Sequence, residues 1–169
     1  GIAAAEAAGL APIKVNVVVQ RGVNDHTVLD LVGYFRATPH TVRLIEFMDV
    51  GTVNDWNLSK VVTAREIIER IDAELPLKPA DSNYHGEVAQ RWVYKDGSGE
   101  IGVISSVTHP FCAGCTRARL TADGRLRLCL LCDQEVDLLT PLRAGASPAA
   151  LRHLILAAVR DKPFGHSLE

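Results

Sequence analysis

The sequence has 169 residues and lacks the features of several common protein classes. No uncharged apolar run approaches the roughly 20 residues that a membrane-spanning helix requires, so we expect no membrane insertion. The formal net charge is only -2, whereas a protein that binds nucleic acid through its overall field is usually strongly basic. We find no signal peptide and no internal repeat, and we expect a cytoplasmic protein with no nucleic acid partner.

Hydrophobic residues make up 47% of the chain and charged residues 22%, as in ordinary globular proteins. Cysteine is scarce, but all four cysteines fall in one stretch, as the pairs Cys112 with Cys115 and Cys129 with Cys132. Two C-x2-C pairs across a hairpin come close to the spacing of structural zinc sites, and thiolates also hold iron–sulfur clusters. Zinc, an iron–sulfur cluster and, third, disulfides therefore remain open on spacing alone.

The segment between the cysteine pairs is predicted to be a β-hairpin with strands over 116–121 and 125–130. A three-residue loop that ends in Gly124, with glycine in the left-handed conformation, is a common hairpin connection. This register places Leu120 opposite Leu126 on one apolar side. The other side collects the residues Arg117, Arg119, Arg125, Arg127 and Cys129. Sulfurs beside a row of guanidinium groups indicate a soft-metal site next to an anion site.

The first part of the chain is predicted to form a right-handed βαβ unit. Composition and periodicity favour a helix over 1–9, a strand of a parallel sheet over 13–20, a helix over 23–36 and a second strand over 41–48. Asn24 or Asp25 is expected to cap the second of these helices.

Both predicted strands carry polar residues where a buried strand needs a reason for them. Lys14 and Asn16 share one face of the first strand, which is either the solvated side of an edge strand or the lumen side of a barrel. Arg43 and Glu46 lie on opposite faces of the second strand. Each of these two requires a partner or a ligand if it is buried.

The later periodicity predicts a helix over 63–75, a hairpin over 88–94 and 100–104, and helices over 135–142 and 148–159. Thr63 and Glu66 are spaced as a capping box for the first of these helices. Residues 78–88 are predicted to be a polar linker. Asp133 and Ser147 are expected to cap the last two helices.

The letters around the cysteines, F-C-A-G-C-T-R-A-R-L-T-A-D-G-R-L-R-L-C-L over residues 111–130, resemble a motif of one enzyme family. It is the C-terminal cluster motif of the GTP 3′,8-cyclases, the radical S-adenosylmethionine (SAM) enzymes that begin molybdenum cofactor biosynthesis. The resemblance implies that a second 4Fe-4S cluster is held by Cys112, Cys115 and Cys129. It also implies that GTP is bound by Arg117, Ala118 and Arg119.

The similarity is not confined to the cysteines. R-L-I-E-F-M over residues 43–48 is similar to the family's R-F-I-E-F-M strand in a partial (β/α) barrel. The resemblance implies that Lys14 and Arg43 contact GTP and that Met48 packs on the adenine of SAM. It also implies a homodimer of the complete enzyme.

The fold class implied by the resemblance is α/β, with late βα units of a partial (β/α) TIM-like barrel followed by a small α+β iron–sulfur C-terminal domain. Residues 1–76 are expected to be the barrel part, and residues 77–166 the cluster and GTP-binding domain. The family's N-terminal C-x3-C-x2-C motif, which holds the first cluster, is absent from this sequence. We therefore expect a C-terminal fragment of the family's enzyme that is inactive alone.

Cys132 is an addition to the family's three-cysteine pattern. On a continuing strand, a residue three positions after Cys129 faces the opposite side, which argues against cluster ligation. A tight turn could still return it to the other sulfurs. The alternative interpretation is accordingly a zinc-ribbon-like interaction module that uses all four cysteines. Under the cluster interpretation Cys132 is a small buried residue.

Overall fold

The structure is a computed structural model, and it describes residues 1–49, 55–112, 115–131 and 133–162. The chain divides into two compact units, residues 1–111 and residues 112–169, and each is described by itself. No helix in the described part of the chain is long and apolar enough to cross a membrane.

The first unit is built on a five-stranded mixed sheet in the order β1-β2-β5-β4-β3. The strands are β1 (Lys14–Val19), β2 (Thr41–Glu46), β3 (Leu77–Ala80), β4 (Gln90–Tyr94) and β5 (Glu100–Ile104). The strands β1, β2 and β5 run parallel, whereas β4 pairs antiparallel with both β5 and β3. The predicted α/β class is confirmed, with a sheet that is mixed rather than purely parallel.

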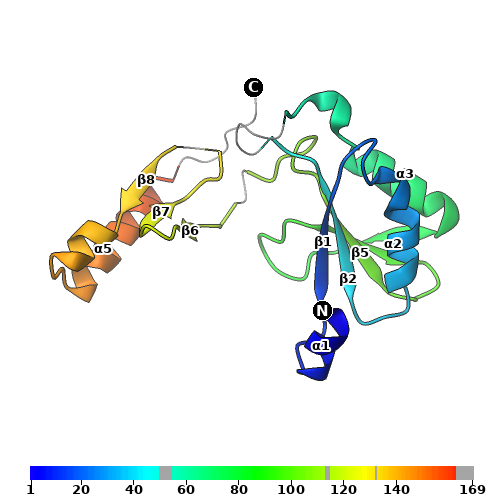
Figure 1. The fold of residues 1–169 in the computed structure, drawn as a ribbon, viewed down its shortest axis with the longest axis horizontal. Coiled ribbons are helices and arrows are strands. Elements are labelled where there is room, and N and C mark those ends of the chain that lie inside the picture. The colour runs from blue at the N-terminus through cyan, green and yellow to red at the C-terminus, as the bar shows by residue number, and fades with distance from the viewer. Residues whose placement is uncertain (50–54, 113–114, 132, 163–169) are drawn as a thin grey trace. The chain divides into compact units, whose positions relative to one another are not determined.

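Two helices cover one face of this sheet. The helices of the first unit are α1 (Ile2–Ala7), η1 (Asp25–Thr27), α2 (Val28–Phe35), η2 (Leu58–Lys60) and α3 (Ala64–Glu74). Figure 1 shows α2 and α3 together on one side of β1, β2 and β5. The helix α2 connects the parallel strands β1 and β2, so the predicted βαβ order is confirmed.

The core lies between these helices and the sheet. Alternate strand residues point into it and are at most 1% exposed, namely Val42, Leu44, Ile101 and Val103. The helices contribute residues at helical spacing, namely Val28, Val32, Ile67 and Ile71, all nearly fully buried. The predicted capping box of α3 is present, since Thr63 Oγ1 accepts from the Glu66 amide and Glu66 Oε2 accepts from the Thr63 amide.

The predicted caps of α2 are wrong. The regular helix begins only at Val28, after the short 3₁₀ helix η1. Asn24 Oδ1 accepts instead from the Gln20 amide at 2.8 Å, and Asp25 Oδ1 accepts from the Gly22 amide at 2.7 Å. Both side chains therefore stabilise the turn before the helix, as Asn and Asp commonly do.

The predicted polar linker over 78–88 is wrong at its start, because residues Leu77–Ala80 form the edge strand β3. In this strand Pro79 is opposite Trp92 of β4. Proline lacks an amide donor, and an edge strand tolerates it because one side of the strand needs no ladder partner. Proline was therefore a sign of an edge strand at this position.

The second unit contains the predicted hairpin. Its strands are β6 (Arg119–Leu120), β7 (Arg125–Arg127) and β8 (Glu135–Asp137), in the order β6-β7-β8. Leu120 pairs with Leu126 and Arg119 with Arg127, so the predicted register is confirmed. Gly124 has φ +75°, the left-handed conformation that the three-residue loop requires.

The helix predicted over 135–142 is wrong in its first half. Residues Glu135–Asp137 form the strand β8 beside β7, and α4 covers only Leu139–Arg143. Tertiary pairing decided this segment, because Glu135 lies opposite Arg127 and forms an ion pair with it. The Thr140 amide donates to Asp137, so the predicted cap Asp133 is also wrong.

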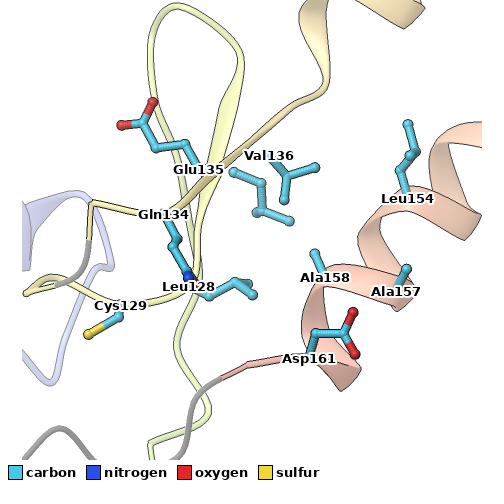
Figure 2. Close-up of a pocket in the computed structure, with 10 residues that line it drawn as sticks. Leu128, Cys129, Gln134, Glu135, Val136, Leu154, Ala157, Ala158 and Asp161 are labelled. Carbon is cyan, nitrogen blue, oxygen red and sulfur yellow. The ribbon is translucent and has the colours of Figure 1, made fainter.

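The last helix, α5 (Pro148–Arg160), agrees with the prediction, and Ser147 caps it by accepting from the Ala150 amide at 3.2 Å. Figure 2 shows the helix with Leu154, Ala157 and Ala158, which line one pocket together with Val136. Leu128 points toward the same helix. Cys129 points away from it. Both residues follow β7, which ends at Arg127 and is thus shorter than the predicted strand.

The boundary between the two compact units lies between Phe111 and Cys112 in the sequence. This point lies later in the chain than the expected division between residues 76 and 77, because β3, β4 and β5 belong to the first sheet. The assignment of barrel and cluster roles to the two ranges stays a prediction.

Candidate functional site

The segment from Cys112 to Ala118 is called the cysteine loop here, and it begins with one C-x2-C pair. The Cys115 amide donates to the Cys112 carbonyl at 3.1 Å, which closes a turn. Cys112, Cys115 and Cys129 are all half-buried. Cys132 lies outside the described residues, so its predicted exclusion from the site stays a prediction.

A guanidinium group rests directly on one of these sulfurs. Arg117 Nε and Nη2 each donate to Cys115 Sγ at 3.2 Å. The ammonium of Lys162 also faces this loop, with Nζ 2.7 Å from the Cys115 carbonyl oxygen and 3.0 Å from that of Arg117. The predicted pairing of a sulfur with an arginine is therefore present in the described loop.

These cations change the acidity of the thiol. Burial alone would raise the pKa of Cys115, but the amide and guanidinium of Arg117, with the charge of Lys162, lower it below its ordinary value. Thiolate is the form that metals bind and that acts as a nucleophile. The loop thus makes Cys115 more acidic than an ordinary cysteine.

The arginine row is not uniform. Arg127 forms an ion pair with Glu135, and Arg125 lies 3.1 Å from Asp123 and 3.6 Å from Glu135. These acids neutralise the charge of the β7 arginines. Arg119 is exposed and makes no ion pair or side-chain hydrogen bond to another residue in the described ranges. Ala118, beside it, is exposed as well.

The donor set suits an iron–sulfur cluster in its chemistry, since the motif offers three thiols and the segment of Cys115 carries compensating cations. Within the described ranges, which omit residues 113, 114 and 132 of this motif, no three potential ligands are close enough together to hold a metal ion. The ligand assignment for Cys112, Cys115 and Cys129 accordingly stays a prediction.

In the first unit, the predicted GTP residues share the sheet face opposite α2 and α3. Asn16 pairs with Arg43, and Arg43 pairs with Gly102 of β5. Lys14, one alternation before Asn16, lies on the same face and is exposed. Lys14 and Arg43 are thus brought to one face of adjacent strands.

Gly102 makes room for Arg43. A Cβ atom at position 102 would lie 3.1 Å from Arg43 Cγ and 3.2 Å from the Cβ of Ala89. The guanidinium of Arg43 is 3.8 Å from Glu87 Oε1, and the Glu87 side chain is only 2% exposed. Arg43 therefore has a fixed stem and an acidic neighbour, which sequence reasoning missed because Glu87 lies in the predicted polar linker.

Glu46 occupies the opposite face and is fully buried. Its carboxylate accepts from the amides of Ala64 at 2.7 Å, Val107 at 2.7 Å and Thr108 at 2.8 Å, and from the Thr108 hydroxyl at 2.6 Å. The required partner is thus a set of amides and a hydroxyl rather than a cation. Met48 follows two residues later and is half-buried.

Fold and site together define the class of protein: an α/β protein whose second unit presents cysteines beside cationic side chains. The chain belongs to the Molybdenum Cofactor Synthesis C family, whose model matches residues 40–168.

Its similarity to curated proteins is high. It is 54% identical over 154 residues to the GTP 3′,8-cyclase of Xanthomonas axonopodis pv. citri, with 91% of this chain and 46% of the relative covered. The protein of the same name from Acidothermus cellulolyticus is 48% identical over 151 residues, with 89% and 42% covered. That from Staphylococcus epidermidis is 43% identical over 141 residues, with 83% and 42% covered. The chain thus spans less than half the length of these relatives and matches their C-terminal part.

Proposed function

We propose that this chain supplies the cluster-binding and GTP-binding part of a GTP 3′,8-cyclase. Such an enzyme converts GTP to (8S)-3′,8-cyclo-7,8-dihydroguanosine 5′-triphosphate, the first step of molybdenum cofactor biosynthesis. The observation that carries the proposal is the contact of Arg117 with Cys115 Sγ at 3.2 Å. It joins a soft-metal ligand and an anion-binding group in one loop, and the names of the relatives agree with it.

In this function Cys112, Cys115 and Cys129 would hold a 4Fe-4S cluster. With three protein thiolates, one iron of such a cluster would have no protein ligand. The cluster would therefore supply a site that binds an atom of the substrate. Arg117 stabilises the thiolate of Cys115 by two charge-assisted contacts. Arg119 and the backbone at Ala118 lie beside it on the exposed hairpin and would bind GTP.

The first unit would supply the remaining contacts. Its sheet, with β1 at an open edge, would be the late part of a partial barrel, and the face of Lys14 and Arg43 would line its lumen. Inward-facing cations in a barrel suit a triphosphate, since guanidinium and ammonium groups both make charge-assisted bonds to it. Met48 would pack on SAM.

The division of chemistry also implies what this chain does not do alone. Its sequence has no C-x3-C-x2-C motif for the cluster that cleaves SAM. Purified chain with GTP, SAM and a reductant should therefore give no cyclised nucleotide. Formation of that product would contradict the proposed division of roles.

The direct test is metal analysis of the chain prepared without oxygen, with an absorption spectrum. Iron and sulfide with a broad visible band support the cyclase function. Zinc at one ion per chain, without sulfide, supports the zinc-ribbon-like interaction module, which the two C-x2-C pairs favour.

Alanine variants separate these two functions further. Cys132→Ala should keep its cluster, whereas Cys112→Ala, Cys115→Ala or Cys129→Ala should lose it. Loss of metal from Cys132→Ala equal to that from the other three would favour a four-thiolate zinc site.

A further inference from the structure

Lys162 follows the last helix, and its side chain reaches back to the cysteine loop. Its Nζ is 2.7 Å from the carbonyl oxygen of Cys115, 3.0 Å from that of Arg117 and 3.7 Å from Cys115 Sγ. An ammonium group has three donors and no acceptor. All three donors of Lys162 can therefore be used on one short segment of backbone and one sulfur.

This segment, residues 115–118, lies outside the described strands. The strand β6 begins only at Arg119, so residues 115–118 take no part in the described sheet pairing. The carbonyls of Cys115 and Arg117 flank Thr116, and fixing both of them restricts the backbone between the two. The loop is thus held by a residue more than 40 positions later in the chain.

A cation at the end of a helix has an ordinary explanation, because it interacts favourably with the helix dipole. That explanation suits Arg160, the last residue of α5, which is exposed. It does not explain Lys162, because the carbonyls that Lys162 binds belong to the cysteine loop and not to α5. Arg160 is therefore a matched control for charge at the same helix end.

We propose that Lys162 is a positioning residue of the cysteine loop, which holds Cys115 and Arg117 in contact and places a positive charge beside the metal-binding sulfur. This inference rests on the proposed function. Two consequences follow. The loop should release its metal more slowly when Lys162 is present. A bound cluster should also be easier to reduce, because a nearby cation stabilises the more negative, reduced form.

The experiment uses the chain loaded with iron and sulfide without oxygen, in the variants Lys162→Met, Lys162→Arg and Arg160→Met. Iron loss to a chelator should be about tenfold faster or more in Lys162→Met, the effect usual for removal of an outer partner of a metal ligand. The reduction potential of its remaining cluster should be more negative. Lys162→Arg keeps the charge and should restore the potential, whereas Arg160→Met should match the wild type in both measurements.

Equal iron retention and equal potential in Lys162→Met and wild type would overturn the inference. So would equal effects of Lys162→Met and Arg160→Met, because the charge of the helix end would then explain both. Failure of the proposed function gives a different result, in which the wild-type chain itself takes up zinc and no iron with sulfide. Far-ultraviolet circular dichroism of each variant identifies any that fails to fold. If Lys162→Met fails to fold, iron loss and reduction potential are compared between Lys162→Arg and the wild type.

Discussion

The two units of this chain are stabilised in different ways. The first unit buries a continuous set of apolar side chains between its sheet and two helices. In the described part of the second unit, Leu126 is the one hydrophobic residue that is buried, and it is still 8% exposed. Several of its large apolar side chains are instead exposed, among them Leu120, Leu142, Ile155 and Val159.

This difference indicates what each unit needs in order to stay folded. A single core in a domain below about 70 residues rarely supplies enough stability, and small domains often add a structural metal. The second unit is of this kind, and its cysteines would supply such a staple. The first unit has a continuous apolar core and contains none of the cysteines.

Metal removal should give the largest difference in amide exchange protection between the two units. A chelator added to the iron-loaded chain should abolish amide exchange protection in β6, β7 and β8, because the metal-binding loop leads directly into β6. Protection in β2, α3 and β5 should not change. Hydrogen exchange with mass spectrometry measures both at once, and equal loss in the two units would contradict the comparison.

Within the first unit, Glu46→Gln should have a large effect. The glutamine amide would present N–H groups to backbone N–H groups, which leaves buried donors unpaired and costs about 3 kcal/mol. Both tryptophans, Trp56 and Trp92, lie in this unit, so their fluorescence during urea unfolding reports on it alone. The matched control is Glu66→Gln. Like Glu46, Glu66 accepts from an amide at the start of α3, but its carboxylate is exposed.

Truncation of a buried side chain should cost more in the first unit than in the second. Ile71→Ala removes a fully buried side chain from the core and should cost about 3 kcal/mol. Leu126→Ala should cost about 1 kcal/mol, because Leu126 lines a pocket beside α5 and fewer contacts are lost. The free energy of opening of each unit, from hydrogen exchange, measures the two costs, and a larger cost for Leu126 would reverse the comparison.

The smallest effect should come from Glu66→Gln, about 0.5 kcal/mol at neutral pH, because glutamine can still accept from the Thr63 amide and only the negative charge is lost. The amide of Thr63, then Arg21, lower the pKa of Glu66 below its ordinary value of 4.5. A lowered folded pKa means that ionised Glu66 stabilises above pH 4.5 and that this contribution is lost as the pH falls through the folded pKa. Wild type and variant should therefore converge in acid, and a constant difference in urea midpoint from pH 7 to pH 3 would contradict this account.

The sequence was sufficient wherever one local signal decided the structure. Hydrophobic alternation and Gly124 predicted the hairpin register, and the Thr63–Glu66 spacing predicted the start of α3. These signals act over a few residues and need no information about distant contacts.

The sequence was not sufficient where contacts with distant residues determine the structure. β8 forms because Glu135 lies beside Arg127, and β3 forms because an edge of the sheet was open to it. The same holds at the site, where Lys162 reaches the cysteine loop and Glu87 reaches Arg43 only through the folded chain. A lysine and a glutamate in polar stretches give no local signal for these contacts.

Glu46 also has a consequence for how the sheet selects its alignment during folding. A slip of β2 by one residue would turn every side chain of the strand to the opposite face. Glu46 would then leave the amides of Ala64, Val107 and Thr108, and those donors would be buried without an acceptor. Glu46 thus adds the loss of polar partners to the loss of burial that Val42 and Leu44 would undergo in a misaligned strand. The buried carboxylate therefore favours the native register of β2, which carries Arg43 and leads to Met48.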